Sequence, residues 1–501
     1  MNLARLGLAL ATGILVVAAL PGGVAWPLAF VALTPLALAI RGTTPAQSAA
    51  LGLVSGVVAC GWGFRWVVGP IERFGGVAPV VTILAMAGLA LVQGARFSVL
   101  GALAAFAERR GAPPPIAFGA AFVAAEACTP ALVPWNFGAT LVDAPVLVQT
   151  AELWGVVPIG GFLAVIAASL ADAIAKRRVK TIAMAASGAL LLATLGYGLV
   201  RIAQVDRAIE QSPVARIGVV QGNVPLVGSE GDELVAMVEQ IRLHHELAAR
   251  GAELIVWSEG AVPGVLDERA IRGDLPALFG TDAAAIVGVT VVGDDGLPRN
   301  SVLAIEGGVL RGRYDKQQLL PFSETLPLST VFPVLRSLAP GAGNFVPGTV
   351  AAPLRVRGRD VAAVVCCEDA SGAQVSAVSA GRASLLVSLS NDTWFAEPEP
   401  VTHLALARLR AVEQRRYLVR ATNDAVSAIV DPIGRIVARA ETGRAVALSS
   451  DVRWMGGRSF YDRIAAFFPI FAAIFWVLVA IAWPTRGANS RRVTAIMPER
   501  A

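Results

Sequence analysis

The chain has 501 residues, of which 55% are hydrophobic and only 16% are charged, and its formal net charge is +5. A typical soluble protein has about 45 to 50% apolar residues, so this composition excludes an ordinary soluble enzyme and indicates that much of the chain lies in lipid. The basic residues stand in short loops between apolar runs and form no patch interleaved with aromatic residues. A nucleic-acid partner is therefore not expected.

Eight apolar runs are long enough to cross a bilayer, which takes about 20 helical residues. They cover residues 4–20, 24–40, 48–68, 78–106, 115–133, 157–175, 181–203 and 464–483. No clear small-residue cleavage site follows the first run, so we interpret it as a retained helix and not as a signal peptide. The sequence thus predicts an α-helical transmembrane bundle of eight spans, with seven before and one after a long polar segment.

Lys and Arg residues indicate how the bundle is oriented, because cytoplasmic loops carry an excess of them. A cytoplasmic N-terminus places the following basic residues on the cytoplasmic side: Arg5, Arg41, Arg109, Arg110, Lys176, Arg177, Arg178, Lys180, Arg486, Arg491 and Arg492. The opposite loops hold few such charges, Arg73 among them. We therefore expect a seven-span domain at 1–206, an extracytoplasmic domain at 207–460, and a last helix with a cytoplasmic tail at 461–501.

Between residues 207 and 460 the apolar runs become short and are separated by polar, Gly and Pro residues, which is typical of strands that alternate with helices. The expected strands are RIGVVQ, ELIVW, AAIVGVTVV, SVLAI, VAAVVC, SLLVSLS and VSAIV. Helical spacing of apolar residues predicts one helix at 232–250 and a second at 407–421. Mixed sheets with outer helices are the simplest architecture for this pattern.

Three short strings each place a reactive side chain just after an expected strand. They are WSEGAVP with Glu259, YDKQQLLPFSE with Lys316 and Glu324, and VVCCED with Cys366 and Cys367. A thiol is a good nucleophile only as a thiolate, so it needs a proton acceptor and a positive neighbour. Glu259 can be the base and Lys316 the cation, and the same ammonium can stabilise the oxyanion of a tetrahedral intermediate.

The three strings and their order resemble the nitrilase superfamily, whose αββα sandwich holds a Glu-Lys-Cys triad. The resemblance implies a C-x-E motif, which makes Cys366 the nucleophile and Glu368 an accessory carboxylate. Cys367 then occupies a position that is often Tyr in that family. Because successive residues of an extended segment point to opposite faces, we expect only one of the two cysteines to face Glu259 and Lys316.

The fusion of this domain to seven preceding spans and one following span resembles the bacterial apolipoprotein N-acyltransferases. Further strings support the resemblance: VVQGNVP at 219–225, SNDTWF at 390–395, HLALARLRAVEQRRYLVRATND at 403–424, DPIGRI at 431–436, and, less specifically, PWNFG at 134–138 and ELWG at 152–155. Ala396 stands where Gly is common in that family, and no Trp follows the QGNVP string. The resemblance covers nearly the whole chain.

This resemblance implies a ping-pong acyl transfer in a multi-pass protein of the bacterial inner membrane, with its catalytic domain on the periplasmic side. The thiolate takes an acyl chain from a phospholipid, and the thioester then acylates the amino terminus of a diacylglyceryl-cysteine apolipoprotein. Glu324 would hold the ammonium of Lys316 in place, and Glu368 would support the nucleophile loop. Neither a metal nor a cofactor is implied.

Two other functions stay open from the residues alone. A membrane-anchored nitrilase-like amidohydrolase would use the same triad and pass through the same thioester, with water in place of the amine. A multi-span transporter or receptor with a ligand-binding external domain would not need Glu259, Lys316 and Cys366 together. The eight spans favour a lipid acyl donor, because an enzyme that acts on small soluble amides would have no use for a membrane domain.

Several other residues have both a structural and a functional interpretation. Glu126 lies in the fifth apolar run, where an ionisable group is expensive and suggests function, although it could also lie near the membrane surface. The only histidines, His244, His245 and His403, lack the spacing of a metal site, so we expect helix-face or hydrogen-bonding roles. The stretch LPLSTVFPVLRSL at 326–338 is either a lid that dips into lipid or an amphipathic helix on the sheet.

Overall fold

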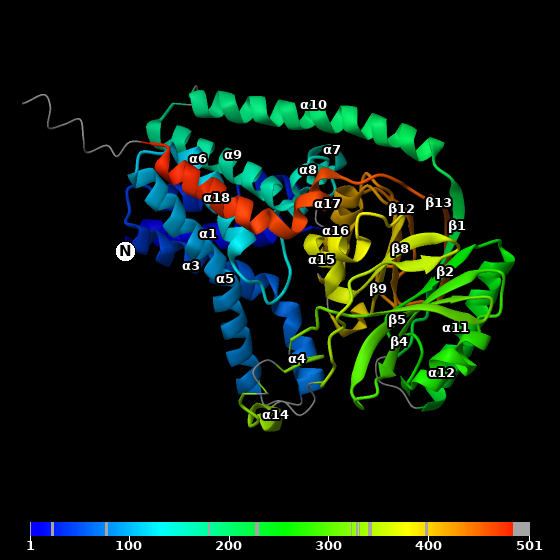
Figure 1. Ribbon diagram of the computed structural model, residues 1–501. Helices are drawn as coiled ribbons and strands as arrows, with labels where there is room; N and C mark the ends of the chain where they lie inside the picture. The colour runs from blue at the N-terminus through cyan, green and yellow to red at the C-terminus, as the bar shows by residue number, and fades with distance from the viewer. Residues whose placement is uncertain are drawn as a thin grey trace, which may run out of the picture.

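The computed structural model describes residues 2–21, 25–75, 79–178, 181–225, 230–321, 323–326, 329, 331–338, 343–395 and 399–483. A helical bundle and an α/β domain lie next to each other, and the long helix α10 runs along the bundle and leads into the first strand of the domain (Figure 1). Lys180, Ala396 and the tail that contains Arg486, Arg491 and Arg492 lie outside the described residues.

Each of the eight expected spans coincides with a helical segment. These segments are α1 Leu3–Ala18, η1 Trp26–Phe30 followed by α2 Thr34–Ala39, α3 Pro45–Gly63, α5 Pro79–Arg109, α6 Pro114–Cys128, α9 Val157–Lys176, α10 Ile182–Gln211, and α17 Phe460–Ile464 continued by η6 Ala465–Phe467 and α18 Phe468–Ile481. Five helices of the described chain are long and apolar enough to cross a membrane: Pro45–Gly63, Pro79–Arg109, Val157–Lys176, Ile182–Gln211 and Phe460–Ile481. The segments Leu3–Ala18, Trp26–Ala39 and Pro114–Cys128 are apolar but shorter.

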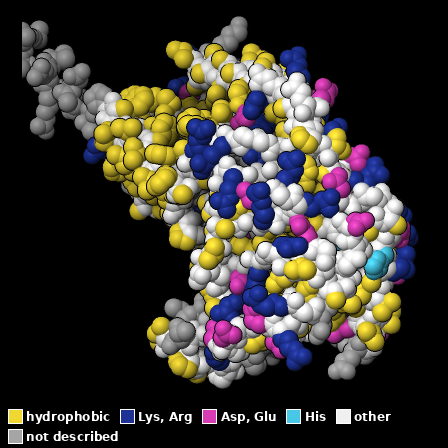
Figure 2. Space-filling view, turned by 45° about the vertical axis from the view of Figure 1, so that its right-hand side comes forward, with side chains coloured by type: hydrophobic (Ala, Val, Ile, Leu, Met, Phe, Trp, Pro, Cys, Tyr) yellow, Lys and Arg dark blue, Asp and Glu magenta, His cyan; other side chains and the backbone are white. Residues whose placement is uncertain are grey.

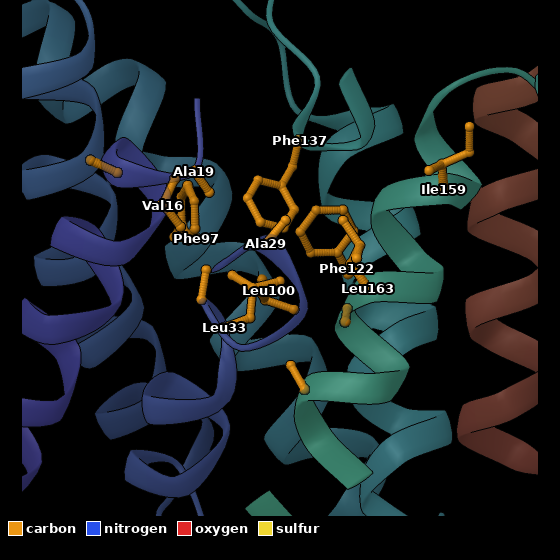
Figure 3. Packing of buried hydrophobic residues seen from close by; sticks show 14 of the residues in the cluster. Val16, Ala19, Ala29, Leu33, Phe97, Leu100, Phe122, Phe137, Ile159 and Leu163 are labelled. Carbon is orange, nitrogen blue, oxygen red and sulfur yellow. The ribbon is translucent and has the colours of Figure 1, made fainter. Parts of the chain in front are cut away.

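Small residues let the bundle helices pack closely, as is common in membranes. A side chain added to Gly56 of α3 would come within 2.2 Å of the carbonyl oxygen of Gly94 in α5. Short elements join the long helices: η2 Arg65–Val67, α4 Val68–Gly75, η3 Phe137–Leu141, α7 Pro145–Val148 and α8 Ala151–Trp154. The interior between them is filled by aliphatic and aromatic side chains, among them the labelled residues of Figure 3.

The outside of the bundle is apolar where a soluble protein would be polar. Leu199 of α10 is 65% exposed and Ile474 of α18 is 51% exposed, and many large apolar neighbours on both helices are exposed as well. Figure 2 shows a continuous hydrophobic surface over the bundle, whereas charged side chains are scattered over the α/β domain. Exposed apolar surface of this extent marks a region that lipid covers.

Two sheets form the α/β domain. The first has the order β13-β1-β2-β4-β5-β6, with β3 beside β4, and the second has the order β12-β11-β10-β9-β8-β7. The strands of the first sheet are β1 Val214–Gln221, β2 Leu254–Trp257, β3 Val265–Leu266, β4 Ala284–Val292, β5 Pro298–Glu306, β6 Val309–Asp315 and β13 Val446–Arg453. Those of the second are β7 Leu354–Val356, β8 Arg359–Val365, β9 Leu385–Ser390, β10 Leu418–Thr422, β11 Ala428–Val430 and β12 Ile436–Arg439.

The two sheets pack face to face, with helices on both outer faces. Val256 of the first sheet and Val364 of the second belong to one hydrophobic core. Helix α11 Glu230–Ala249 covers the outer face of the first sheet, where Leu247 packs in the same cluster as Trp257. Helices α15 Gly372–Ser379 and α16 Glu399–Gln414 cover the second sheet. The short helices of the domain are α12 Glu268–Arg272, α13 Asp274–Ala277, α14 Leu335–Leu338, η4 Cys366–Ala370 and η5 Asp392–Trp394.

Helix α16 also joins the domain to the bundle, because Leu409 packs into the bundle core. Charged side chains add to this interface. Arg408 Nη1 donates to Asp143 Oδ1 at 2.6 Å, and Arg415 Nε donates to Glu152 Oε2 at 2.7 Å. The strands that carry the reactive residues are thereby fixed relative to the membrane helices.

The prediction of one helix at 407–421 is wrong for the second half of this range. Helix α16 ends at Gln414, Arg415 has a left-handed backbone with φ of 53°, and Leu418–Thr422 is strand β10. This strand is fully buried and pairs with β9 on one side and β11 on the other. A short apolar run of this kind fits a helical pattern as well as a buried strand, so burial between two strands decides its structure. Strands β3, β6, β7, β12 and β13 were also not predicted.

The stretch at 326–338 is not a long helix on the sheet. Within its described part, only Leu335–Leu338 is helical, and Val331, Phe332 and Val334 are 65%, 54% and 64% exposed. The amphipathic-helix interpretation is therefore wrong, because the apolar side chains that it would bury face outward.

Candidate active site

The three expected reactive residues follow three strands that end near one another. Glu259 stands two residues after β2, Lys316 directly after β6, and Cys366 directly after β8. Strands β2 and β6 run in the same direction through β4 and β5, so their carboxyl ends reach the same edge of the first sheet. The structure brings Glu259, Lys316 and Glu324 into direct contact there.

Lys316 is held between two carboxylates. Its side chain is 1% exposed, and Nζ lies 2.8 Å from Glu324 Oε2, 2.9 Å from Glu324 Oε1 and 3.4 Å from Glu259 Oε1. Burial alone would lower the pKa of this ammonium, but Glu259, the Cys366 sulfur and Glu324 outweigh burial and hold its pKa well above the usual value. Lys316 therefore stays charged at any working pH of an enzyme.

Glu259 has the surroundings of a general base. Burial raises the pKa of its carboxyl, Lys316 opposes this rise, and Glu324 adds to it. One carboxylate oxygen accepts a hydrogen bond from Asn300 Nδ2 at 2.7 Å, and the other accepts one from the backbone N–H of Asn391 at 2.9 Å. A carboxylate with a raised pKa takes up a proton more readily, which suits proton abstraction near neutral pH.

Cys366 occupies a sharp turn at the end of β8. Its φ of 52° lies in the left-handed region, and it begins the 3₁₀ helix Cys366–Ala370. The residue is 6% exposed, and its interaction with the Cys367 thiol, then burial and the Glu259 carboxylate raise its pKa well above the usual value, although Lys316 lowers it. The raised pKa keeps this group a thiol at rest.

The expectation that only one cysteine faces the site rests on an extended backbone, and this premise is wrong. Both cysteines belong to the 3₁₀ turn, both line the same cavity, and both act electrostatically on Lys316. They differ in burial and bonding, since Cys366 is buried whereas the half-buried Cys367 donates from Sγ to Gln318 O at 3.4 Å. The turn geometry therefore distinguishes the two thiols less sharply than alternation along a strand would.

Glu324 and Glu368 support the site in different ways. Glu324 contacts the ammonium directly, and it also accepts from Leu320 N at 2.7 Å. Glu368 does not contact Lys316. Its Oε1 atom accepts from Tyr314 Oη at 2.8 Å and Gln317 N at 2.7 Å. Its Oε2 atom accepts from the backbone N–H of Val365 at 2.9 Å, so Glu368 links the loop that begins at Lys316, the lysine loop, to the turn at Cys366.

Two groups of site residues were missed by sequence reasoning. Asn300 of β5 donates to both Glu259 and Glu324 (2.7 and 2.9 Å), and a lone Asn inside a strand gives no signal for this role. Next to Cys366 lies a buried charge cluster, in which His403 Nε2 is 2.7 Å from Asp369 Oδ1 and Arg420 Nη2 is 2.8 Å from Asp392 Oδ2. For His403 we expected a helix-face or hydrogen-bonding role, and its ring also lies 3.3 Å from the Cys366 carbonyl oxygen.

A cavity of about 60 Å³ lies between the turn at Cys366 and the bundle. The cysteines and Leu320 line it on the catalytic side. The opposite walls come from α1, α3 and the segment after α6, and their lining side chains include Val17, Phe64 and Trp135. Cys60 of α3 is buried and also lines this cavity, whereas Cys128 is exposed. Cys366 and Cys367 thus line an apolar space that helices of the bundle also border.

Comparison with known proteins agrees with both parts of the structure. The model of the apolipoprotein N-acyltransferase N-terminal domain matches residues 12–170, and the carbon-nitrogen hydrolase model matches residues 216–450. The apolipoprotein N-acyltransferase of Pseudomonas syringae pv. tomato is 33% identical over 457 residues, which cover 86% of this chain and 87% of the relative. That of Geobacter metallireducens is 28% identical over 480 residues, 91% of each chain. An amidase from Nesterenkonia sp. is a similar solved structure, with 20% identity, a TM-score of 0.39, and coverage of 51% of this chain and 96% of that chain.

The α/β part is therefore a nitrilase-like carbon-nitrogen hydrolase domain fused to a helical bundle, as the resemblance implied. Both matched domains and the full-length relatives confirm the wider assignment. The chain belongs to the apolipoprotein N-acyltransferase family, and it is an enzyme that transfers acyl groups.

Proposed function

We propose that Cys366, Glu259 and Lys316 perform the acyl transfer in two steps, with a phospholipid as donor and a diacylglyceryl-cysteine apolipoprotein as acceptor. In the first step the Cys366 sulfur attacks the ester carbonyl carbon of the lipid while Glu259 takes the thiol proton. Lys316 stabilises the oxyanion that forms. The ester C–O bond then breaks, and the lysophospholipid leaves with the proton from Glu259.

The second step uses the same groups in the same order. The terminal amine of the apolipoprotein attacks the thioester carbonyl carbon, and Glu259 accepts a proton from the nitrogen. Collapse of the second oxyanion breaks the C–S bond, and the proton returns to the Cys366 sulfur. Glu324 holds Lys316 in place during both steps, and Glu368 keeps the lysine loop next to the nucleophile turn through its hydrogen bonds.

The apolar cavity at the thiol is the observation that best supports a lipid donor. A small-amide hydrolase has no use for a reactive thiol that opens between membrane helices, whereas an acyl chain needs an apolar wall next to the nucleophile. An apolar wall lets the acyl carbons approach the thiol from the bilayer without exposure to water, which would cost about 0.8 kcal/mol per methylene group.

Eight spans with the catalytic domain on the periplasmic side fit this reaction. Asp172 near the end of α9 binds Arg41 at 3.0 Å and Lys176 at 2.7 Å, and Arg5 donates to the Arg41 carbonyl oxygen. Basic residues from α1, from the segment after α2 and from α9 thus gather at one end of the bundle, which we assign to the cytoplasm. The α/β domain, which we place at residues 207–460 between the domains 1–206 and 461–501, joins the opposite helix ends.

A pulse and chase with labelled lipid tests this proposal. Purified enzyme is incubated with phospholipid that carries a labelled palmitoyl chain, and the acyl-enzyme is then exposed to a diacylglyceryl-cysteine peptide or to buffer alone. We expect label on Cys366 that moves to the peptide amine and is stable in buffer. Cys128→Ala is the matched control, because this exposed cysteine lies outside the cavity lining. Rapid release of free fatty acid in buffer, with no transfer to peptide, would instead support the amidohydrolase alternative.

A further inference from the structure

The segment between α6 and η3, residues 129–136, has an irregular backbone next to the bundle core, and we call it the wall loop. Val133, Pro134 and Trp135 of the wall loop line the cavity that opens onto Cys366. Non-helical backbone at membrane depth is tolerated only where protein groups or water satisfy its N–H and C=O groups. The groups that hold the wall loop therefore determine the shape of the cavity.

Two side chains of α5 bind the wall loop. Gln93 Nε2 donates to Val133 O at 2.8 Å, and Gln93 Oε1 accepts from Leu132 N at 2.7 Å. Arg96 Nη1 donates to Trp135 O at 2.9 Å, and its guanidinium lies 5.7 Å from the centroid of the Trp135 ring. Gln93 and Arg96 are three residues apart, so they project from the same face of the helix.

Glu126 near the end of α6 binds the other end of the wall loop. Its Oε1 atom accepts from Phe137 N at 2.9 Å and from Asn136 Nδ2 at 3.0 Å. Phe137 in turn packs on Phe122 of α6, with ring centroids 6.1 Å apart (Figure 3). Gln93, Arg96 and Glu126 together bind four backbone groups over six residues, and we call these three side chains the polar clamp.

Stability of the fold alone does not explain why the polar clamp consists of polar and charged side chains. Gln93 is fully buried and Arg96 is 6% exposed. Glu126 Oε2 and Arg96 Nε are buried without a hydrogen-bonding partner among the described residues, although Arg96 and Glu126 interact electrostatically. Unsatisfied buried polar atoms are costly, and an ionisable side chain within a membrane bundle suggests function. The clamp therefore keeps costly groups at the place where the cavity wall is fixed.

We propose that Gln93, Arg96 and Glu126 determine which acyl chains the enzyme accepts, because they fix the wall loop that borders the acyl cavity. This inference rests on the proposed transfer through Cys366. The three residues are positioning residues, since none of them lines the cavity at the thiol. Gln93 and Arg96 act through backbone atoms of the wall loop, and Glu126 acts through the Asn136 side chain and the backbone N–H of Phe137, which follows the loop. A long acyl chain extends along this wall between the membrane helices, whereas a short acyl group occupies only the space next to the thiol.

The test compares a long and a short acyl donor in the full-length enzyme. Arg96→Met and Glu126→Leu are assayed for thioester formation with dipalmitoyl phospholipid and with p-nitrophenyl butyrate, and kcat and KM are measured for each. We expect kcat/KM for the palmitoyl donor to fall about 10- to 100-fold, as for loss of a hydrogen bond to a charged group, with the butyryl donor nearly unaffected. Glu126→Gln keeps an acceptor oxygen for Phe137 N and should recover most of the palmitoyl activity.

Asp172→Asn is the matched control, because Asp172 is a buried bundle carboxylate with two ion pairs outside the cavity lining. It should leave the ratio of palmitoyl to butyryl activity at the wild-type value. If Arg96→Met and Glu126→Leu keep the wild-type ratio of palmitoyl to butyryl activity while the wild type forms its thioester on Cys366, the proposed role of the polar clamp in acyl-chain selection is wrong but the proposed function is not. Absence of any thioester on Cys366 in the wild type would overturn the proposed function as well.

Discussion

Replacement of Lys316 by Met removes the ammonium but keeps an unbranched side chain of similar length. In the native site this ammonium lies 2.8 Å from Glu324 and 3.4 Å from Glu259, and it is almost completely buried. Its loss removes a positive charge from the place where the oxyanion forms. It also removes the group that opposes the pKa rise of Glu259.

Both losses slow the reaction, and their sizes can be worked out separately. Removal of one oxyanion donor costs about 100- to 1000-fold in rate. Without Lys316, burial and the Glu324 charge raise the pKa of Glu259 unopposed, and each unit of rise above the assay pH costs about a further tenfold in ionised base. We therefore expect thioester formation in Lys316→Met to fall by at least about 100-fold at neutral pH from the lost oxyanion donor, and further through the raised pKa of Glu259.

The pH dependence separates charge from geometry. Activity rises with pH as Glu259 loses its proton, so a higher pKa moves this rising limb to higher pH. Lys316→Met should show the shift. Lys316→Arg should not, because the charge is kept, yet it should still be nearly inactive since a planar guanidinium cannot present a compact ammonium to the oxyanion. Rates of palmitoyl thioester formation across pH measure both effects, and thermal unfolding in detergent confirms that the variants are folded. Wild-type rates in folded Lys316→Arg, or an unshifted limb in Lys316→Met, would refute this reasoning.

Three further predictions concern the supporting residues and the topology. Glu368→Gln places an amide N–H against buried donors, so the free energy of unfolding should fall by about 1 to 3 kcal/mol, and thermal unfolding that matches the wild type would contradict this role. Asn300→Leu removes the donor to Glu259, so kcat should fall about tenfold or more while the protein stays folded; a normal kcat would show that Asn300 is not needed. An alkaline phosphatase fusion near Gly251 should be active, and an inactive fusion beside an active cytoplasmic reporter at the same site would reject the periplasmic assignment.

The sequence predicts the helical segments and the places of Glu259, Lys316 and Cys366 at strand ends, because both leave strong local signals. An apolar run of membrane length has few alternatives, and each of the eight runs does correspond to helical structure. Glu259, Lys316 and Cys366 stand directly after or close to strands whose apolar pattern is plain. The carboxyl ends of β2 and β6 lie at the same edge of the first sheet, and this brings Lys316 close to Glu259 and to Glu324 in the following loop.

The parts that the sequence did not predict depend on tertiary contacts. Residues 418–422 continue a helical pattern and become a strand only because β9 and β11 pair with them. Asn300 of β5 donates to Glu259 and Glu324, which lie in two separate loops, and no local sequence pattern indicates these contacts. The positive φ of Cys366 turns an expected strand end into a 3₁₀ turn, and this turn places both thiols along one cavity.

For that reason the identity of the acylated thiol is the most direct test of the mechanism. Enzyme treated with dipalmitoyl phospholipid is digested and analysed by mass spectrometry, for the wild type and for Cys366→Ala and Cys367→Ala. We expect a hydroxylamine-sensitive palmitoyl group on Cys366 in the wild type and in Cys367→Ala, and none in Cys366→Ala. A palmitoyl group on Cys367 that persists in an active Cys366→Ala enzyme would contradict the assignment of Cys366 as the nucleophile.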